Sequence, residues 1–497
     1  MLDTILGALD TTSVFVFLLV FLIGYYWLTS PKNMPPGPMG LPLIGNLLQL
    51  RAAGSNQLEL LKKWRQQYGD VFAIRLGSKN LVFISDYKIL QETFVKNGDI
   101  FSGRPSNLYI INQIKKKTGT GVILSEGAIW KELRRVTLMT MRDFGVGKKS
   151  LEQRVLDEAL AVVEVLEKGE GQPVLFKPLL SKFACNVICS IILGDRFDYD
   201  DKTFIELTKL VNLAVSQPLV FAPVNFLPIT RFAPAGKKII HDVVDSFVTI
   251  DNFLGTVLKE HEETYDPSEI RDFVDFYIKT RSDSDDAHLY DASNMRRVII
   301  DLFAAGTETT ATTLSWILLY FAAYPEVQTR CQQDIDKVVG QGRSATMDDR
   351  KNLPYIEAVI TEIFRVVNIA PVAVPHVAVK EGKIRQYTVP AETIVIGNIR
   401  EIHLDPVNWP EPDIFKPERF LDKDGNFCPP KKNFMPFSIG PRACLGEVLA
   451  RMETFLLFCT LVQSFTFVMP QGQKPDLQGQ FGVTYSGKPQ PFLAKRR

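Results

Sequence analysis

The sequence predicts one large, mainly α-helical domain with small β-sheets, preceded by a single membrane-spanning helix. Three observations support this prediction: an uncharged apolar run lies near the N-terminus, most later segments space their apolar residues as helices do, and short extended segments occur in only two regions. Of the 497 residues, 46% are hydrophobic and 23% are charged, which excludes a disordered or fibrous chain. The 57 Lys and Arg residues nearly balance the 56 Asp and Glu residues, so the net charge indicates no nucleic-acid partner.

The first element is the run from Thr11 to Pro31, which contains no charged residue and ends near Tyr25, Tyr26 and Trp27. A helix of this length reaches about 30 Å, the thickness of the hydrocarbon layer, and aromatic residues favour the membrane interface. A cleaved signal peptide is the alternative, but positive charge does not precede the run and no small-x-small cleavage site follows it. Because basic residues follow the run, we expect the rest of the chain to stay on the cytosolic side.

We therefore divide the chain into an anchor (1–30), a hinge (31–44) and a catalytic domain (45–497). The hinge is too rich in proline for a helix or a central strand. The predicted strands are Val71–Arg75 and Leu81–Ile84, with further extended segments at Ala370–Val379 and Pro390–Ile396. The predicted helices are Trp130–Met141, Leu151–Val165, Lys237–Leu258, Met295–Ala323, Pro325–Val338, Ile356–Val367 and Leu445–Val462.

Two further segments are predicted to be loops. Ser282–His288 is acidic and is expected to be a solvated turn. Pro218–Pro234 mixes Phe and Leu with four prolines, so it is either a loop that faces the core or a second contact with lipid.

One cysteine differs from the other five, which we expect to be buried free thiols. Cys444 lies in the segment Phe437–Gly446 (FSIGPRACLG), directly before a predicted helix. Two glycines allow a tight turn and close approach to another body, while loop amides and the helix N-terminus favour a thiolate. Phe437 can shield the sulfur and Arg442 can meet an anionic group. These are the requirements for a cysteinate bound to haem iron.

The segment resembles the haem-binding signature of the cytochrome P450 superfamily, FxxGxRxCxG, at every fixed position. The resemblance covers roughly residues 31–495, and its details are similar to the animal microsomal branch that hydroxylates drugs, fatty acids and steroids. It implies a cytochrome P450 fold, a haem b cofactor and Cys444 as the axial ligand of the iron. One departure is Pro441, where many relatives have a basic residue.

A second motif, Asp301–Thr310 (DLFAAGTETT), lies inside a predicted helix. Gly and adjacent Thr residues are poor choices for a helix interior, so the segment is either a tolerated kink or a widened groove. In the second interpretation Thr309 holds water or dioxygen and Glu308 connects to a proton supply. The motif is similar to the family's oxygen-activation sequence.

A third motif is structural. Glu362 and Arg365 form an ExxR pair on one helix face, although Glu132 and Arg135 fit the same pattern without the same role. The position of Glu362 and Arg365, well before Cys444, favours a structural role for this pair rather than for Glu132 and Arg135. The resemblance implies that Arg419 joins the ion pair.

The resemblance also implies a set of residues that bind the haem propionates. They are Arg104, Trp130, Arg134, His376 and Arg442. Axial ligation by His376 is the alternative to Cys444. The substrate pocket is expected to draw on the loop around Ile110–Lys117, on Ala304 and Ala305, on Val372–Val374 and on Val483–Thr484.

The function expected from these motifs is that of a haem-thiolate monooxygenase in the endoplasmic reticulum membrane, with one span and a cytosolic catalytic domain. Its substrates are O2 and a lipophilic molecule: a fatty acid, a steroid or a foreign compound. No flavin or nicotinamide motif is found, so the resemblance implies NADPH–cytochrome P450 reductase as the electron donor, with cytochrome b5 as a possible second one. Basic residues that flank the haem-binding segments are candidates to attract the acidic surface of the reductase: Lys131, Arg135, Lys431 and Lys432. The alternatives are a haem-thiolate isomerase or dehydratase, against which Thr309 argues, and a haem-binding sensor without turnover.

Overall fold

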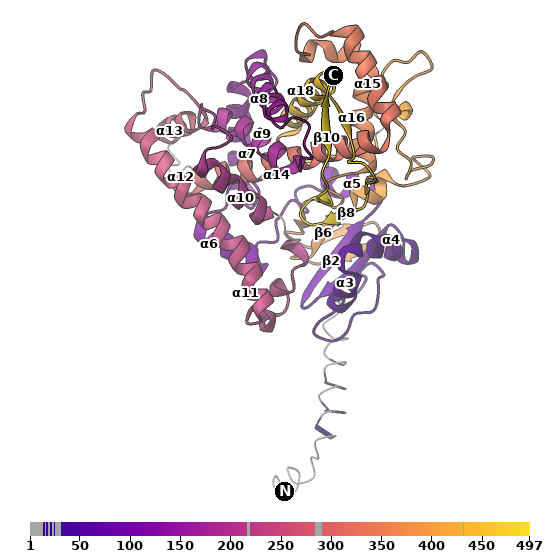
Figure 1. Cartoon of the computed structure of the whole chain (residues 1–497). Coiled ribbons are helices and arrows are strands. Elements are labelled where there is room, and N and C mark those ends of the chain that lie inside the picture. Colours follow the sequence, from indigo (N-terminus) through magenta and orange to yellow (C-terminus); the bar gives the residue numbers. More distant parts are fainter. Residues whose placement is uncertain are drawn as a thin grey trace, which may run out of the picture.

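The computed structural model describes residues 31–215, 219–283, 291–430 and 432–497, together with a few residues between Ser13 and Gly24. Helices dominate it, and small sheets lie mainly at one end (Figure 1). The helices of the first half are α3 (Leu47–Ala53), α4 (Gln57–Tyr68), α5 (Tyr87–Gln91), α6 (Tyr109–Thr118), α7 (Gly127–Asp143), α8 (Lys149–Lys168), α9 (Phe176–Ile192), α10 (Lys202–Val215) and α11 (Pro234–Ile240). Those of the second half are α12 (Ser246–Glu263), α13 (Phe273–Asp283), α14 (Ala292–Ala323), α15 (Pro325–Val338), α16 (Pro354–Val366), α17 (Ile399–His403) and α18 (Glu447–Ser464).

Helix α14 is the central element of the fold. It runs for 32 residues, and buried side chains occur all around it. Helix α9 packs along it and is buried on nearly every side as well. A helix that is apolar all round belongs in a core, and these two helices occupy the middle of the main hydrophobic cluster.

The largest sheet has the strand order β1-β2-β6-β3. Strands β1 (Val71–Leu76) and β2 (Lys79–Ile84) are antiparallel, β2 and β6 (Ile394–Gly397) are parallel, and β3 (His376–Val377) is antiparallel to β6. A bridge between Gly103 and Val377 extends the edge at β3. The sheet thereby brings the segment before Arg104 beside His376.

Three two-stranded ribbons complete the fold. They pair β4 (Gly382–Ile384) with β5 (Tyr387–Val389), β7 (Phe465–Val468) with β10 (Leu493–Arg496), and β8 (Gly479–Phe481) with β9 (Tyr485–Gly487). The β8–β9 ribbon contacts α14, which places the C-terminal segment against the central helix.

The predicted fold class of the catalytic domain is confirmed, with two local differences. The expected loop around Ile110–Lys117 is instead helix α6, and its mixed Ile and Lys residues form one buried and one basic face. The predicted helix Lys237–Leu258 is divided by a π-helical turn at His241–Asp245. Within Pro218–Pro234, the described part contains the short 3-10 helices Leu219–Phe221, Pro223–Asn225 and Pro228–Arg231.

The predicted anchor falls mostly outside the described residues, as does part of the acidic turn Ser282–His288. In the part of the chain that the structure describes, no helix has both the length and the apolar character needed to cross a membrane. Residues that follow Pro31 enter the domain at its lower end in Figure 1, beside α3 and near α11.

Candidate active site

The loop before α18 holds Cys444 in a fixed position. The Cys444 N–H donates to the Phe437 carbonyl at 3.0 Å, and the Ala443 N–H donates to the Gly440 carbonyl at 3.0 Å. Gly440 has a φ of 84°, and a Cβ there would collide with the Phe94 carbonyl, so only glycine allows this close approach. The loop therefore holds Cys444 at one point directly before the helix.

Cys444 is exposed as a residue, whereas four of the other cysteines are buried and Cys428 is intermediate; the protein nevertheless surrounds the Cys444 sulfur closely enough to desolvate its thiolate. Burial raises the pKa of the Cys444 thiol and Glu447 adds to this effect, while the Gly446 N–H and Arg134 oppose it. The expectation that the loop by itself favours a thiolate is thus met only in part. A coordinating metal ion reverses this balance, because it deprotonates a bound thiol outright.

Beside the cysteine loop lies a cluster of arginines that bond mostly to backbone carbonyls. Arg104 donates to the carbonyls of Ile123, Val374 and Pro375. Arg442 donates to the carbonyls of Ser102, Val122 and Ser125. Arg134 donates to the Ala443 carbonyl at 2.6 Å, next to Cys444.

Burial makes the charge on these groups costly. It lowers the pKa of Arg104 to about 10, and together with repulsion from Arg104 it lowers the pKa of Arg442 to about 8. Glu126 opposes both shifts, and one of its carboxylate oxygens accepts the Arg104 backbone N–H. The Arg442 guanidinium also stacks on the ring of Trp130, 3.8 Å from its centroid. The cluster thus carries more positive than negative charge and favours an anionic ligand.

His376 belongs to the same cluster. Its ring stacks on Phe94 with the centroids 3.8 Å apart, and its Nδ1 lies 2.6 Å from the Phe101 carbonyl oxygen. Burial, followed by Arg104 and Arg442, lowers its pKa well below the usual value, so the imidazole is neutral. The Phe94 ring and the Phe101 carbonyl thus fix the orientation of the imidazole. The structure also places His376 in one cluster with the other residues that the resemblance assigns to the propionates: Arg104, Trp130, Arg134 and Arg442.

Helix α14 contributes the two residues predicted to handle protons. The Thr309 hydroxyl donates to the Ala305 carbonyl at 2.6 Å, and this side of the helix is open: Ala305 is exposed and Thr309 is half-buried. Such a bond to the preceding turn commonly bends a helix. Helix α14 is nevertheless continuous through the motif, so the Gly and Thr residues do not interrupt it.

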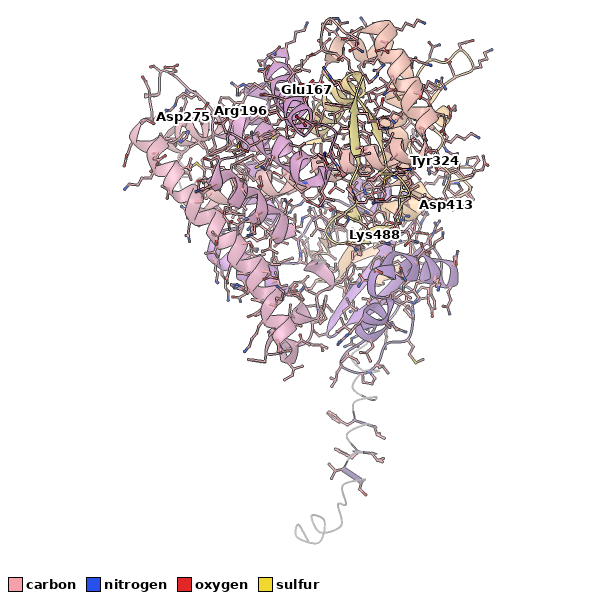
Figure 2. All side chains as sticks on the ribbon, viewed as in Figure 1. Glu167, Arg196, Asp275, Tyr324, Asp413 and Lys488 are labelled. Atoms are coloured by element: carbon pink, nitrogen blue, oxygen red, sulfur yellow. The ribbon has the colours of Figure 1, made fainter. Side chains whose placement is uncertain are left out.

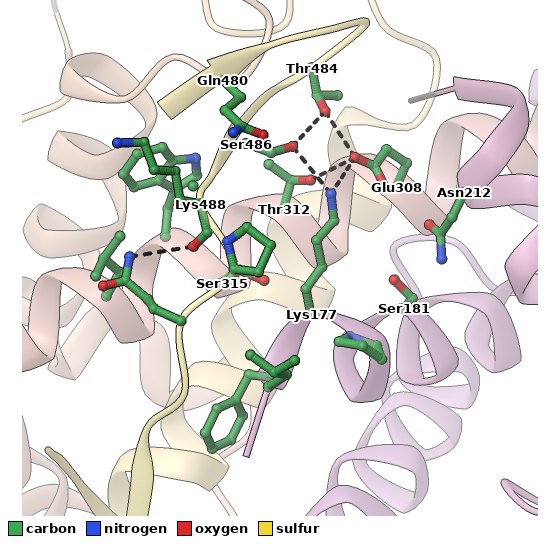
Figure 3. Close-up of a pocket in the computed structure, with 18 of the residues that line it drawn as sticks. Lys177, Ser181, Asn212, Glu308, Thr312, Ser315, Gln480, Thr484, Ser486 and Lys488 are labelled. Atoms are coloured by element: carbon green, nitrogen blue, oxygen red, sulfur yellow. Dashed lines mark hydrogen bonds and ion pairs between the residues drawn. The ribbon is translucent and has the colours of Figure 1, made fainter. Parts of the chain in front are cut away.

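Glu308 faces a different space from Thr309. One of its carboxylate oxygens accepts hydrogen bonds from Lys177 Nζ at 2.7 Å, Thr484 Oγ1 at 2.9 Å and Thr312 Oγ1 at 3.1 Å (Figure 3). The Glu308 side chain is 6% exposed, while that of Lys177 is 37% exposed. Within the described residues, no hydrogen bond links the side chains of Glu308 and Thr309. Sequence analysis missed Lys177, one of two lysines in an otherwise apolar helix, because it belongs to no recognisable motif.

The predicted structural ion pair is fully buried. Glu362 binds Arg365 in two-point fashion at 2.7 and 2.8 Å, and both side chains are 0% exposed. Arg419 Nε donates to the same carboxylate at 3.2 Å, and the Lys416 backbone N–H donates to it at 2.9 Å. By contrast, the Glu132–Arg135 pair has side chains that are 30% and 59% exposed.

Residues near the cysteine loop also carry the predicted basic groups for a redox partner. Lys131 and Arg135 are exposed on α7, and Lys432 is exposed before the loop. Arg135 bonds to Glu132, which reduces its free charge. Lys431 lies outside the described residues.

Comparison with known proteins identifies the family. Residues 35–494 match the family described as Cytochrome P450. The chain is 37% identical to cytochrome P450 2H2 of Gallus gallus over 97% of this chain and 98% of the relative. It is 40% identical to cytochrome P450 2C38 of Mus musculus (87% and 88%) and 38% identical to cytochrome P450 2J2 of Homo sapiens (92% and 90%). The chain therefore belongs to the cytochrome P450 family, in its animal branch, and is a cytochrome P450 monooxygenase.

Proteins of this family bind haem b through a cysteine thiolate, and the residues present here fit that group. The exposed Cys444 suits the iron. The buried arginine cluster, with backbone carbonyls as its main partners, suits the paired carboxylates of the propionates. Both features belong to the same loop and its immediate neighbours.

Proposed function

We propose that this chain is a membrane-anchored monooxygenase with Cys444 as the axial ligand of its haem. The reaction consumes O2, two electrons and two protons; one oxygen atom enters a C–H bond of a lipophilic substrate and the other leaves as water. When bound, the haem supplies the activation of dioxygen, and a thiolate ligand favours cleavage of the O–O bond. The observation that carries this proposal is the exposed Cys444 beside a buried cluster of arginines.

In this proposal five residues bind the propionates. Arg104 and Arg442 are already desolvated, so a carboxylate that reaches them gains charge-assisted bonds without a new desolvation cost for the protein. Trp130 supports the Arg442 guanidinium from one face. His376 is neutral and hydrogen-bonded through Nδ1, which leaves Nε2 as an acceptor for a protonated propionate or a water molecule.

Proton delivery is assigned to Thr309 and Glu308. The Thr309 hydroxyl lies on the open side of α14 and donates its proton to a backbone carbonyl, so its lone pairs remain free to hold a water molecule. Glu308 is buried, but it reaches the solvent-accessible Lys177 through a direct ion pair. Because these two side chains are not hydrogen-bonded to one another within the described residues, the proposal requires water between them.

The substrate is proposed to be a fatty acid, a steroid or a foreign lipophile. The expected pocket residues Ala305, Val374 and Val483 are exposed, while Ile110 and Ala304 are buried. Small apolar side chains of this kind accept several lipophilic classes. We further propose that NADPH–cytochrome P450 reductase supplies the electrons, attracted by Lys131 and Lys432 near the cysteine loop, with cytochrome b5 as a second donor.

Residues 1–30 are proposed to anchor the domain in the endoplasmic reticulum membrane as a single span. A second lipid contact is proposed at Ile229 and Phe232, which are 75% and 73% exposed. Both precede α11, which lies at the same lower end of the molecule as α3 in Figure 1. Exposed apolar side chains in this position are typical of a membrane-contacting surface.

The decisive test is Cys444→Ala, with Cys428→Ala as the matched control because Cys428 is also a non-buried free cysteine. The carbon monoxide complex of the reduced protein should lose its thiolate absorption band in the first variant and keep it in the second. An unchanged band in Cys444→Ala would overturn the ligand assignment. Measuring NADPH consumption and oxygenated product with added reductase distinguishes the monooxygenase from an isomerase or dehydratase, which forms product without NADPH, and from a sensor, which forms none.

A further inference from the structure

A second pocket lies behind the residue pair that supplies protons in the proposed function. Its volume is about 470 Å³, and it is lined by the start of α9, the end of α10, one face of α14 and the β8–β9 ribbon with the chain that follows. Figure 2 labels Lys488, one of the lining residues, near the centre of its view. Neither Cys444 nor Thr309 lines this space, while Glu308 and Thr484, an expected residue of the substrate pocket, form part of its wall.

One part of the pocket wall is apolar. Phe176, Trp316 and Leu319 are core residues that present a surface to it, and Leu175 and Val215 extend that surface outward. A volume of this size falls within the range of about 300–1,000 Å³ that is usual for small-molecule sites.

The polar part contains two groups that the fold leaves unsatisfied. Ser181 is 1% exposed, and its hydroxyl has no hydrogen-bond partner among the described residues. The Asn212 side-chain oxygen is likewise buried without a described partner. Figure 3 shows both side chains on the same side of Lys177. Buried polar groups are normally hydrogen-bonded to protein or to ordered water, so two such groups at one wall offer hydrogen-bonding capacity to a polar occupant.

The charge of the pocket selects the kind of partner. Lys177 and Glu308 neutralise each other at 2.7 Å, and Lys488 is paired with Asp476 at 2.8 Å. A carboxylate head group would approach Glu308, and an ammonium head group would approach Lys177; either would be desolvated without gaining a free counter-charge. An uncharged hydroxyl suits Ser181 and Asn212 without this cost, because it can donate to the Asn212 side-chain oxygen and also pair with the Ser181 hydroxyl.

We propose that this pocket is a second small-molecule site for an uncharged amphipathic alcohol. Its hydroxyl head bonds to the Ser181 hydroxyl and donates to the Asn212 side-chain oxygen, and its apolar body packs on Phe176, Trp316 and Leu319. Because Lys177 both lines the pocket and bonds to Glu308, an occupant contacts the predicted proton supply. That consequence rests on the proposed function, whereas binding itself does not.

The test uses the full-length holoenzyme with its haem face blocked by a saturating azole that coordinates the iron. A decan-1-ol derivative that carries a diazirine in its alkyl chain is photo-crosslinked, and the labelled peptides are identified by mass spectrometry. We expect labels within 175–186, 212–215, 308–319 and 480–492, displaced by unlabelled decan-1-ol and at least tenfold less effectively by decanoate or decylammonium. Labels elsewhere, or equal displacement by the charged compounds, would overturn the proposal.

Three variants test whether the labelling reports on this pocket. Ser181→Val should weaken displacement by decan-1-ol about fivefold, the effect of losing one neutral hydrogen bond. Ser190→Val is the matched control, since Ser190 is a buried serine of the same helix that bonds to the Val187 carbonyl and does not line the pocket. Ser315→Phe fills the pocket from α14 and should reduce labelling at least tenfold, which keeps the test valid if Ser181→Val does not fold. Labelling that Ser315→Phe leaves unchanged would refute the site.

Discussion

Replacing Glu362 by Gln removes the negative charge at the centre of a buried network. The carboxylate accepts two bonds from Arg365, one from Arg419 and one from the Lys416 backbone N–H. Arg365 also donates to the carbonyls of His403 and Pro412, so it holds together α16, α17 and the segment before the cysteine loop. In Glu362→Gln the Arg365 guanidinium stays buried, but its counter-charge is gone.

The expected cost follows from burial. Breaking a fully buried ion pair by removing one partner costs about 3–5 kcal/mol, whereas an exposed pair contributes about 0.2–1 kcal/mol. The chain contains its own control, because Glu132 and Arg135 have the same i,i+3 spacing but exposed side chains. Glu132→Gln should therefore change the unfolding free energy by less than about 1 kcal/mol. Since a domain has about 5–15 kcal/mol of stability in total, only Glu362→Gln should bring it near unfolding.

The assay is urea denaturation of both variants. Unfolding is monitored by the absorption band of the reduced carbon monoxide complex, which is lost when the cysteine loop separates from the haem. We expect the midpoint to fall strongly for Glu362→Gln and hardly at all for Glu132→Gln. Equal shifts in the two variants would show that burial does not distinguish the two pairs, and the reasoning would be wrong.

Three further predictions concern protons and the membrane. Thr309→Ala should keep the carbon monoxide spectrum but slow the proton-transfer step about 10²–10⁴-fold, so that product per NADPH falls and peroxide rises. Thr313 is the control, because its hydroxyl bonds to the Thr309 carbonyl: in Thr313→Ala the product per NADPH should not change. Burial and then Arg365 lower the pKa of His403 to about 3; the unfolded chain therefore binds the extra proton below about pH 6.5, and stability falls as the pH falls. His403→Gln should lose about 2 kcal/mol less than the native chain between pH 6.5 and pH 5 in urea denaturation, and an identical loss would contradict this. Deleting Met1–Ser30 should move the protein toward the soluble fraction with its haem spectrum intact, and loss of haem would mean that the segment belongs to the core.

The sequence was sufficient to predict those parts of the candidate site whose residues lie close together in the chain. The cysteine loop could be predicted because its glycines, Arg442 and Cys444 lie within ten residues shortly before a helix, whereas the Phe94 carbonyl that requires glycine at position 440 comes from a distant segment of the chain. The arginine cluster needed the family resemblance, since Arg104 and Arg442 come from distant segments that only the sheet edge and the cysteine loop bring together.

Amphipathic periodicity failed for helix α9, which packs along the central helix α14. Helix α9 was not predicted because nearly every side chain from Phe176 to Ile192 is buried, which removes the contrast between faces on which periodicity depends. The loop expected around Ile110–Lys117 came from the family resemblance, and it is helix α6 instead, with its isoleucines on one buried face. For α9, tertiary packing rather than local pattern determines the structure.

The adjacent residues Glu308 and Thr309 show why a motif does not fix a mechanism. Neighbours on a helix point about 100° apart, so two adjacent side chains cannot face the same space. Thr309 and Ala305 share the open side of α14, while Glu308 turns to Lys177, Thr312 and Thr484. In the proposed function, a proton that passes from Lys177 to dioxygen would therefore travel around the helix rather than along the motif, and a molecule bound in the pocket beside Glu308 would lie next to that route.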